Sequence, residues 1–189
     1  MPAGLCSPAR DAIVPSFAHS DRNQSLAVII MGVSGCGKST LGALLGKAMT
    51  CPFLEGDSFH SPEAVEKMRG GQPLTDADRW PWLDRLGVAT ATASQTHGSA
   101  VAACSALRAA YRDRLRSVIG SHVRFVLLDN SRETLLARLN NRPGHYMPAT
   151  LLDSQIATLE HPLPDAQTLI LTTDVAPDVL RDKVLAWLR

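Results

Sequence analysis

The chain of 189 residues suits one domain with a substantial hydrophobic core. Its 19 basic and 18 acidic residues give a formal net charge of +1, which argues against general binding to a nucleic-acid backbone. The apolar runs are too short to cross a membrane, so we expect no membrane association. The four cysteines show neither C-x-x-C pairing nor metal-ligand spacing, so we expect reduced thiols in a cytoplasmic protein.

The predicted elements begin after an irregular N-terminal segment. Residues 1–25 lack periodicity and the apolar segment of a signal peptide, so we expect a flexible tail there and one domain over 26–189. The apolar stretch 26–31 predicts a strand, and leucines at helical spacing predict a helix over 38–49. Further strands are expected at 52–55, 99–104, 123–128 and 168–172, and further helices at 61–69, 78–95, 106–117, 131–141, 148–159 and 177–188.

The order of these elements indicates an α/β fold. Strands that alternate with helices predict a parallel sheet with helices on both faces, and ligands bind beyond the carboxyl ends of such strands. Two helix starts carry signals of their own: Asn130 followed by Glu133 predicts a capping box, and Pro177 suits a first helical turn. The residues that follow each strand are therefore the candidates for chemistry.

The glycine-rich loop after the first strand fits the spacing G-x-x-x-x-G-K-[ST], which wraps a phosphate with backbone N–H groups. We expect Lys38 on the β- and γ-phosphates and the hydroxyl of Ser39 on Mg²⁺. The amide groups that open the following helix also favour an anion. The predicted nucleotide-binding residues are Gly32, Val33, Ser34, Gly35, Cys36, Gly37, Lys38, Ser39 and Thr40.

Three side chains admit two interpretations each. Cys36 lies in the loop near Lys38, a setting that favours a reactive thiolate which nucleotide would protect from alkylation. The alternative is a small, buried side chain. Trp80 and Trp82, which flank Pro81, form either an aromatic ligand platform or part of the core.

The residues after the second and third strands supply a candidate base. Many P-loop ATPases carry an acidic residue at a strand end to orient the Mg²⁺ shell, but here the third strand ends in Ala103-Cys104-Ser105. Asp57, after the second strand, is then the best candidate for orienting an acceptor hydroxyl and taking its proton late in phosphoryl transfer. The alternative role for Asp57 is an N-cap of the helix near residue 61.

Three further stretches read GDSFHSPEAVEKMRGGQPLTDADRWPWL, ACSALRAAYRDRLR and RLNNRPGHYMPATLLDSQIATLEHP. With the phosphate loop, they resemble the gluconokinases of the small P-loop kinase type, which are related to shikimate and nucleoside monophosphate kinases. The resemblance covers residues 27–188. It implies a three-layer P-loop kinase fold with a five-stranded parallel sheet and a small lid at about 142–150. It also implies ATP- and Mg²⁺-dependent phosphorylation of D-gluconate on its terminal hydroxyl, giving 6-phospho-D-gluconate, and a possible homodimer.

The resemblance also implies roles for residues outside the loop. Guanidinium groups near the lid would clamp the transferring phosphoryl group, His145 marks the lid, and Arg79 or Arg112 would bind the carboxylate of the acceptor. The catalytic set is Lys38, Asp57, Arg138 and Arg142, and the acceptor-binding set is Asp57, His60, Lys67, Asp78, Arg79, Arg112 and His145.

Three positions depart from the family pattern: Ala64 replaces an asparagine, Asp129 stands where glycine is common, and Arg108 replaces a lysine. A sister kinase that acts on shikimate, a nucleoside monophosphate or another sugar acid therefore stays open. A nucleotide-gated switch is a remoter alternative, since residues 84–87 match D-x-x-G but no N-K-x-D motif is present.

Overall fold

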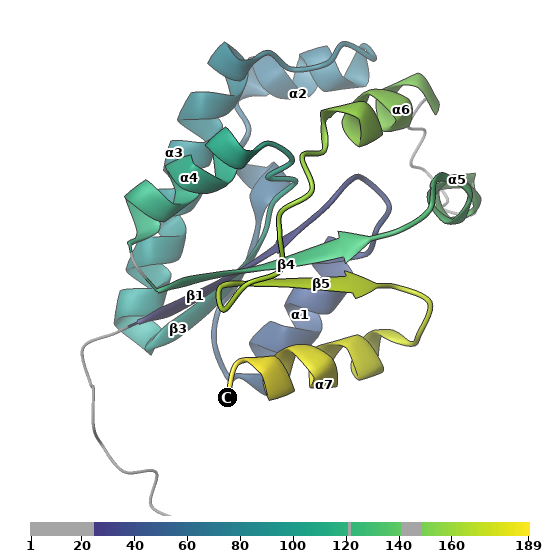
Figure 1. The fold of residues 1–189 in the computed structure, drawn as a ribbon. Coiled ribbons are helices and arrows are strands. Elements are labelled where there is room, and N and C mark those ends of the chain that lie inside the picture. Colours follow the sequence, from purple (N-terminus) through teal and green to yellow (C-terminus); the bar gives the residue numbers. More distant parts are fainter. Residues whose placement is uncertain (1–24, 121, 141–148) are drawn as a thin grey trace, which may run out of the picture.

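The computed structural model describes residues 25–120, 122–140 and 149–189 (Figure 1). Its centre is a five-stranded sheet in the order β2-β3-β1-β4-β5, and all four pairings are parallel. The strands are β1 (Leu26–Met31), β2 (Phe53–Glu55), β3 (Ser99–Ala103), β4 (Val123–Asp129) and β5 (Thr168–Thr172). The predicted α/β class and five-stranded parallel sheet are confirmed.

Helices cover both faces of the sheet, and the molecule is three layers thick (Figure 1). They are α1 (Lys38–Ala48), α2 (Pro62–Arg69), α3 (Asp76–His97), α4 (Ala109–Ile119), α5 (Arg132–Asn140), α6 (Ala149–Thr158) and α7 (Pro177–Trp187), with a 3-10 turn η1 (Gly56–Phe59) after β2. The predicted elements are thus all present. The tail at 1–24 and most of the predicted lid, residues 142–148, lie outside the described residues.

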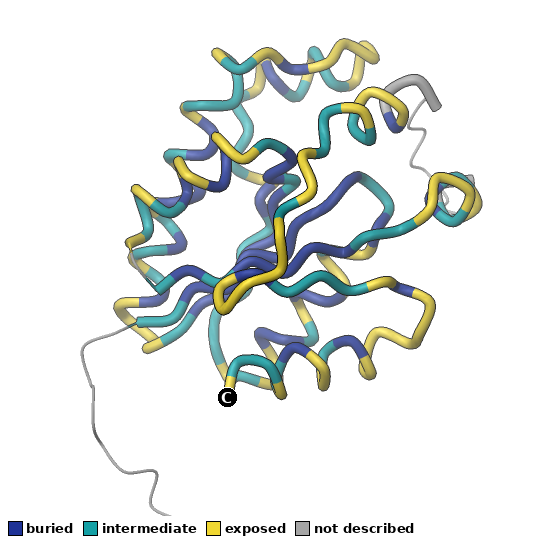
Figure 2. Tube along the Cα trace, viewed as in Figure 1, coloured by how far each residue is buried: buried dark blue, intermediate teal, exposed yellow. Residues whose placement is uncertain are grey.

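The alternation of side chains along β1 explains the layers. Val28 and Ile30 join one buried cluster with leucines of α1 and α7. Ala27 and Ile29 join a second cluster with α3 and α4 on the opposite face. Because both sets are apolar, the central strand is buried on both faces, whereas the edge strands β2 and β5 are mostly half-buried (Figure 2).

Local sequence explains several helix ends. The helix α3 begins with a capping box, in which the Thr75 hydroxyl accepts from the Asp78 N–H and the Asp78 carboxylate accepts from the Thr75 N–H. Pro177 stands in the first turn of α7, as predicted. The capping box predicted at Asn130 is wrong, because the Ser131 hydroxyl accepts from the Thr134 N–H instead.

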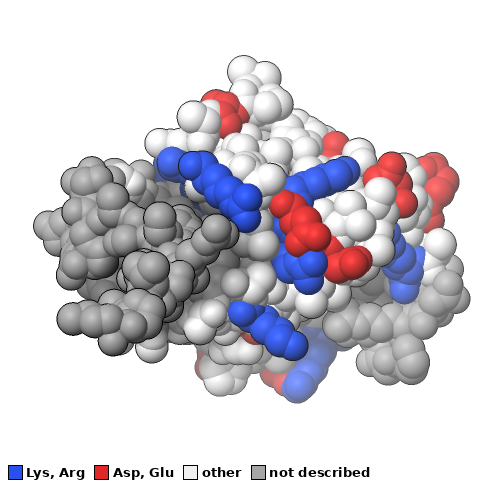
Figure 3. Space-filling model, turned by 90° about the horizontal axis from the view of Figure 1, so that it is seen from below, with Lys and Arg blue, Asp and Glu red and all other residues white. Residues whose placement is uncertain are grey.

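The charged surface is mixed. Figure 3 shows lysine and arginine side chains interspersed with aspartate and glutamate on the face seen from below. Within the described residues, no helix combines the length and the apolar character needed to span a membrane.

Candidate functional site

The loop between β1 and α1 has the backbone shape of a phosphate cradle. Gly32 has φ of +136°, and a Cβ there would lie 2.8 Å from the Leu128 carbonyl oxygen, so only glycine fits. Gly37, the N-cap of α1, has φ of +101°, makes no side-chain cap, and precedes a first turn without acidic residues. The N-terminus of α1 therefore presents backbone dipoles that favour an anion.

The side chain of Lys38 folds back over this loop. Its Nζ donates to the Val33 carbonyl at 2.9 Å and lies 4.0 Å from the Cys36 sulfur. Ser39 and Thr40 are exposed in the same turn. Cys36 is only 1% exposed, which favours the interpretation as a small, buried side chain.

A cavity of about 780 Å³ opens over the loop. It collects side chains from the carboxyl ends of several strands, where a parallel α/β sheet binds its ligands. The lining residues are Ser34, Gly35, Cys36, Gly37, Lys38, Ser39, Thr40, Leu41, Glu55, Asp57, Leu128, Arg138, Thr173, Val175, Pro177 and Leu180. The cavity brings the predicted base, Asp57, together with the predicted phosphate ligands, Lys38 and Arg138.

The guanidinium of Arg138 is held over the loop from α5. It donates to the Thr173 hydroxyl and the Thr173 carbonyl, both at 2.6 Å, and to the Cys36 carbonyl at 3.5 Å. The Thr173 hydroxyl in turn donates to the Asn130 side chain. Sequence reasoning missed Thr173, which follows β5 directly, and Glu55 at the end of β2, although the strand-end rule points to both. Arg142 and His145 lie outside the described residues.

Asp57 and His60 lie on the turn that follows β2. Asp57 is exposed and lies within η1, whereas Ser61 caps α2, so the alternative role of Asp57 as that cap is wrong. The imidazole of His60 stacks on Trp82 with ring centres 4.2 Å apart, and its buried Nδ1 finds no hydrogen-bond partner among the described residues. Burial lowers the pKa of His60, against the opposing charge of Asp57, which favours the neutral ring.

Lys67 and Asp78 bind each other. The Lys67 ammonium lies 2.7 Å from Asp78 Oδ1, and this hydrogen bond is the main reason why the pKa of Asp78 falls far below its ordinary range. Because Asp78 also accepts from Thr75, its carboxylate joins α2 to the start of α3.

Of the two arginines considered for the acceptor carboxylate, Arg112 is buried. It is only 4% exposed, and its NH1 donates to the carbonyls of Ala106 and Leu107, both at 3.1 Å. Its guanidinium therefore supports the turn before α4. Arg79 lies instead against the ring of Tyr111, with 5.6 Å between the guanidinium carbon and the ring centre.

The two remaining alternatives from the sequence are resolved by the fold. The D-x-x-G match lies within α3, and Asp84 forms an ion pair with Arg114 at 2.6 Å instead of following a strand. Trp82 is 1% exposed and its Nε1 donates to the Gly56 carbonyl at 2.7 Å, so it belongs to the core and not to a ligand platform.

Comparisons with known proteins agree with this architecture. A family model described as shikimate kinase matches residues 34–188. The thermosensitive gluconokinase of Escherichia coli (strain K12) is 43% identical over 143 residues, or 75% of each chain. The gluconokinase of Gluconobacter oxydans (strain 621H) is 42% identical over 158 residues, covering 84% of this chain and 88% of that one. This chain belongs to the gluconokinase family.

Solved structures extend the match within the gluconokinases to three dimensions. The crystal structure of a gluconokinase from Sinorhizobium meliloti 1021 has a TM-score of 0.79 and 40% identity, covering 87% of this chain and 91% of that chain. The chain is thus a gluconokinase in sequence and in fold, and its phosphate loop and strand-end residues belong to a kinase.

Proposed function

We propose that this gluconokinase transfers the γ-phosphoryl group of MgATP directly to the terminal hydroxyl of D-gluconate, giving 6-phospho-D-gluconate and ADP. The observation that carries the proposal is the single cavity that Lys38, Arg138 and Asp57 share. A donor phosphate and an acceptor hydroxyl bound there would meet without a covalent enzyme intermediate.

The loop residues hold the donor. Backbone N–H groups of the loop and of the first turn of α1 bind the phosphates, and Lys38 releases Val33 to bind the β- and γ-phosphates. Arg138 balances the charge that spreads over the transferring oxygens, and Thr173 keeps its guanidinium in place before the substrate arrives. Arg142 is proposed to act beside Arg138, and His145 to belong to the lid.

Mg²⁺ suits the oxygen atoms present in this cavity. Ser39 offers a hydroxyl, and Glu55 and Asp57 add carboxylates that can bind the water shell of the ion. Magnesium keeps waters and substrate phosphates as ligands, so the absence of a cluster of three His, Cys, Asp or Glu residues in the described ranges does not conflict with it. When bound, the ion neutralises charge on the β- and γ-phosphates.

The turn after β2 and the start of α3 hold the acceptor. Asp57 orients the terminal hydroxyl and takes its proton late in the transfer. The Nδ1 of His60, which has no hydrogen-bond partner among the described residues, is proposed to hydrogen-bond to a sugar hydroxyl. Arg79 binds the gluconate carboxylate, because its planar guanidinium can donate two parallel hydrogen bonds. Lys67 and Asp78 act mainly by fixing α2 against α3 around that site.

A coupled ADP-release assay tests the proposal. The purified chain is offered gluconate, shikimate, nucleoside monophosphates and other aldonates, with a Lys38→Ala variant as the control for contaminating kinases. Strong, Lys38-dependent ADP release with gluconate supports the proposal. A higher kcat/KM with shikimate or a nucleotide contradicts it. A cytoplasmic location and a homodimer stay predictions, the latter testable by light scattering.

A further inference from the structure

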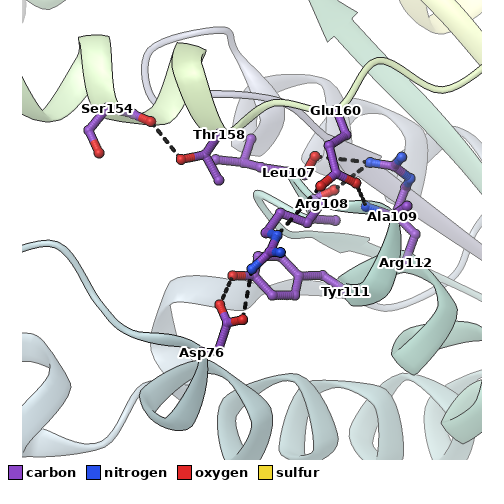
Figure 4. A network of polar contacts seen from close by, with 10 residues as sticks. Asp76, Leu107, Arg108, Ala109, Tyr111, Arg112, Ser154, Thr158 and Glu160 are labelled. Carbon is purple, nitrogen blue, oxygen red and sulfur yellow. Dashed lines mark hydrogen bonds and ion pairs between the residues drawn. The ribbon is translucent and has the colours of Figure 1, made fainter.

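A glutamate beyond the end of α6 caps a helix far away in the sequence. Glu160 Oε2 accepts from the Ala109 N–H at 2.6 Å, and the Glu160 N–H donates to the Leu107 carbonyl at 2.9 Å (Figure 4). The N-cap residue of α4, Arg108, supplies no side-chain cap of its own. Glu160 therefore closes the N-terminus of α4 from another element.

Arg108 extends this contact to the start of α3. Its Nε lies 3.5 Å from Glu160 Oε1, and its NH1 donates to Asp76 Oδ2 at 2.7 Å (Figure 4). The Tyr111 hydroxyl donates to the other oxygen of Asp76 at 2.5 Å. Three segments that are distant in sequence, at 76, 108–111 and 160, are thus joined through the guanidinium of Arg108 and the carboxylates of Asp76 and Glu160.

The ring of Tyr111 connects this network to the proposed acceptor site. It is 2% exposed, and its faces and edge are packed by neighbours: the guanidinium carbons of Arg79 and Arg108 lie 5.6 and 5.7 Å from its centre. Trp80 meets the ring at 5.4 Å in an edge-on arrangement. With its hydroxyl fixed by Asp76, the ring is a rigid surface against which Arg79 lies.

Stability alone is a weak reason for such a network. The side chains of Arg108, Asp76 and Glu160 are 40%, 46% and 49% exposed, and solvent screens ion pairs this exposed, so they add little to stability. What the contacts do fix is geometry, namely the direction of the first turn of α3, which carries Arg79.

The segment that leads from α6 to Glu160 also contacts the phosphate loop. Gln155, on α6, accepts from the Ser34 N–H in the phosphate loop at 2.7 Å. The chain from α6 to Glu160 therefore contacts both the loop that would hold the donor and the network behind Arg79. We therefore expect a displacement of this segment to alter the loop and the network together.

We infer that Glu160 is a positioning residue for acceptor recognition, which acts through Arg108, Asp76 and Tyr111 to hold Arg79 where the acceptor carboxylate binds. This inference rests on the proposed function, in which Arg79 binds that carboxylate. Glu160 itself touches neither substrate.

The test compares Glu160→Gln with wild type in steady-state kinetics. The glutamine keeps an oxygen for the Ala109 N–H but removes the charge that faces Arg108, so the helix cap and the fold survive. We expect KM for gluconate to rise roughly tenfold, because a displaced Arg79 binds the carboxylate of this small substrate less well. KM for ATP and the melting temperature should change little. Asp153→Asn is the matched control, since Asp153 lies on α6 in a similarly exposed ion pair with Arg132, outside the network.

A double-mutant cycle with Arg79→Lys tests whether Glu160 acts through Arg79 or disturbs the acceptor site in some other way. If Glu160 acts through Arg79, Glu160→Gln adds little to the KM for gluconate once Arg79 is changed. Additive effects, equal increases in both KM values, or kinetics like those of Asp153→Asn overturn the inference. If the wild type prefers another acceptor of the panel, the proposed function fails, and the same cycle with that acceptor still tests the role of Glu160.

Discussion

Asp57 and Lys38 enter one cavity from different elements, η1 and the first turn of α1. In the proposed mechanism Lys38 binds the donor, whereas Asp57 acts mainly on the acceptor hydroxyl. For Asp57→Asn we expect kcat to fall by roughly 10²–10⁴, because the hydroxyl loses its proton acceptor, while the Kd for ATP stays within about twofold. A coupled assay and calorimetry measure the two quantities, with Asp84→Asn, which is paired with Arg114, as the control. An unchanged kcat would remove the role assigned to Asp57.

His60 provides a prediction about pH. Burial holds its pKa below the ordinary 6.5, so the unfolded chain binds more protons in the range just below that pH. The contribution of His60 to stability is therefore complete above about 6.5 and declines as the pH falls towards the folded pKa. NMR titration of the imidazole should give a pKa under 6.5, lower still in Asp57→Asn because an opposing charge is lost. A measured value at or above 6.5 contradicts this.

Only some of the candidate site residues could be predicted from the sequence. The spacing of the phosphate loop and the position of Asp57 after a strand were enough to predict that they meet, because both follow from the parallel sheet. The burial of Arg112 could not be predicted, because its guanidinium bonds to carbonyls of a turn in which Ala106 has φ of +41°. Thr173 could have been found, because it directly follows a predicted strand.

At the scale of elements, the close approach of η1 to the end of β3 depends on Gly56. A Cβ there would lie 2.0 Å from the Ala103 carbonyl oxygen, a backbone atom that cannot move aside without disturbing β3. We expect Gly56→Ala to lower the free energy of unfolding by roughly 1–3 kcal/mol, as overpacking does. Urea unfolding measures the loss. Gly70→Ala is the control, because its φ is −74° and its nearest neighbours are 3.5 Å away, so it should be nearly neutral.

Element boundaries departed from prediction where tertiary contacts replace local signals. The helix expected at 106–117 begins at Ala109, because the preceding residues form the turn that Arg112 and Glu160 support. The side chain expected to cap α5, that of Asn130, bonds to Thr173 from the next strand end instead. Apolar periodicity predicted the strands and helices themselves, since it depends only on which faces are buried.

For the whole molecule, ion pairs between helices predict a sensitivity to acid. Neighbouring donors hold the pKa values of four aspartates below the ordinary 3.8: Asp76, Asp78, Asp84 and Asp153. Folded pKa values that are depressed give stability that is present above about pH 4 and lost as the pH falls through them. We expect a lower urea midpoint at pH 3 than at pH 7, and a smaller difference in Asp84→Asn. Equal midpoints at the two pH values would refute this.

The stack of His60 on Trp82 provides an optical signal at the proposed acceptor site. Trp82 is one of three tryptophans, and its indole N–H is bonded to the carbonyl of Gly56, directly before Asp57. Because the imidazole is stacked on the indole, any shift of His60 changes the surroundings of that indole. Ligand that engages His60 should therefore change the fluorescence of Trp82, so acceptor binding can be titrated in the cuvette without ATP and without turnover.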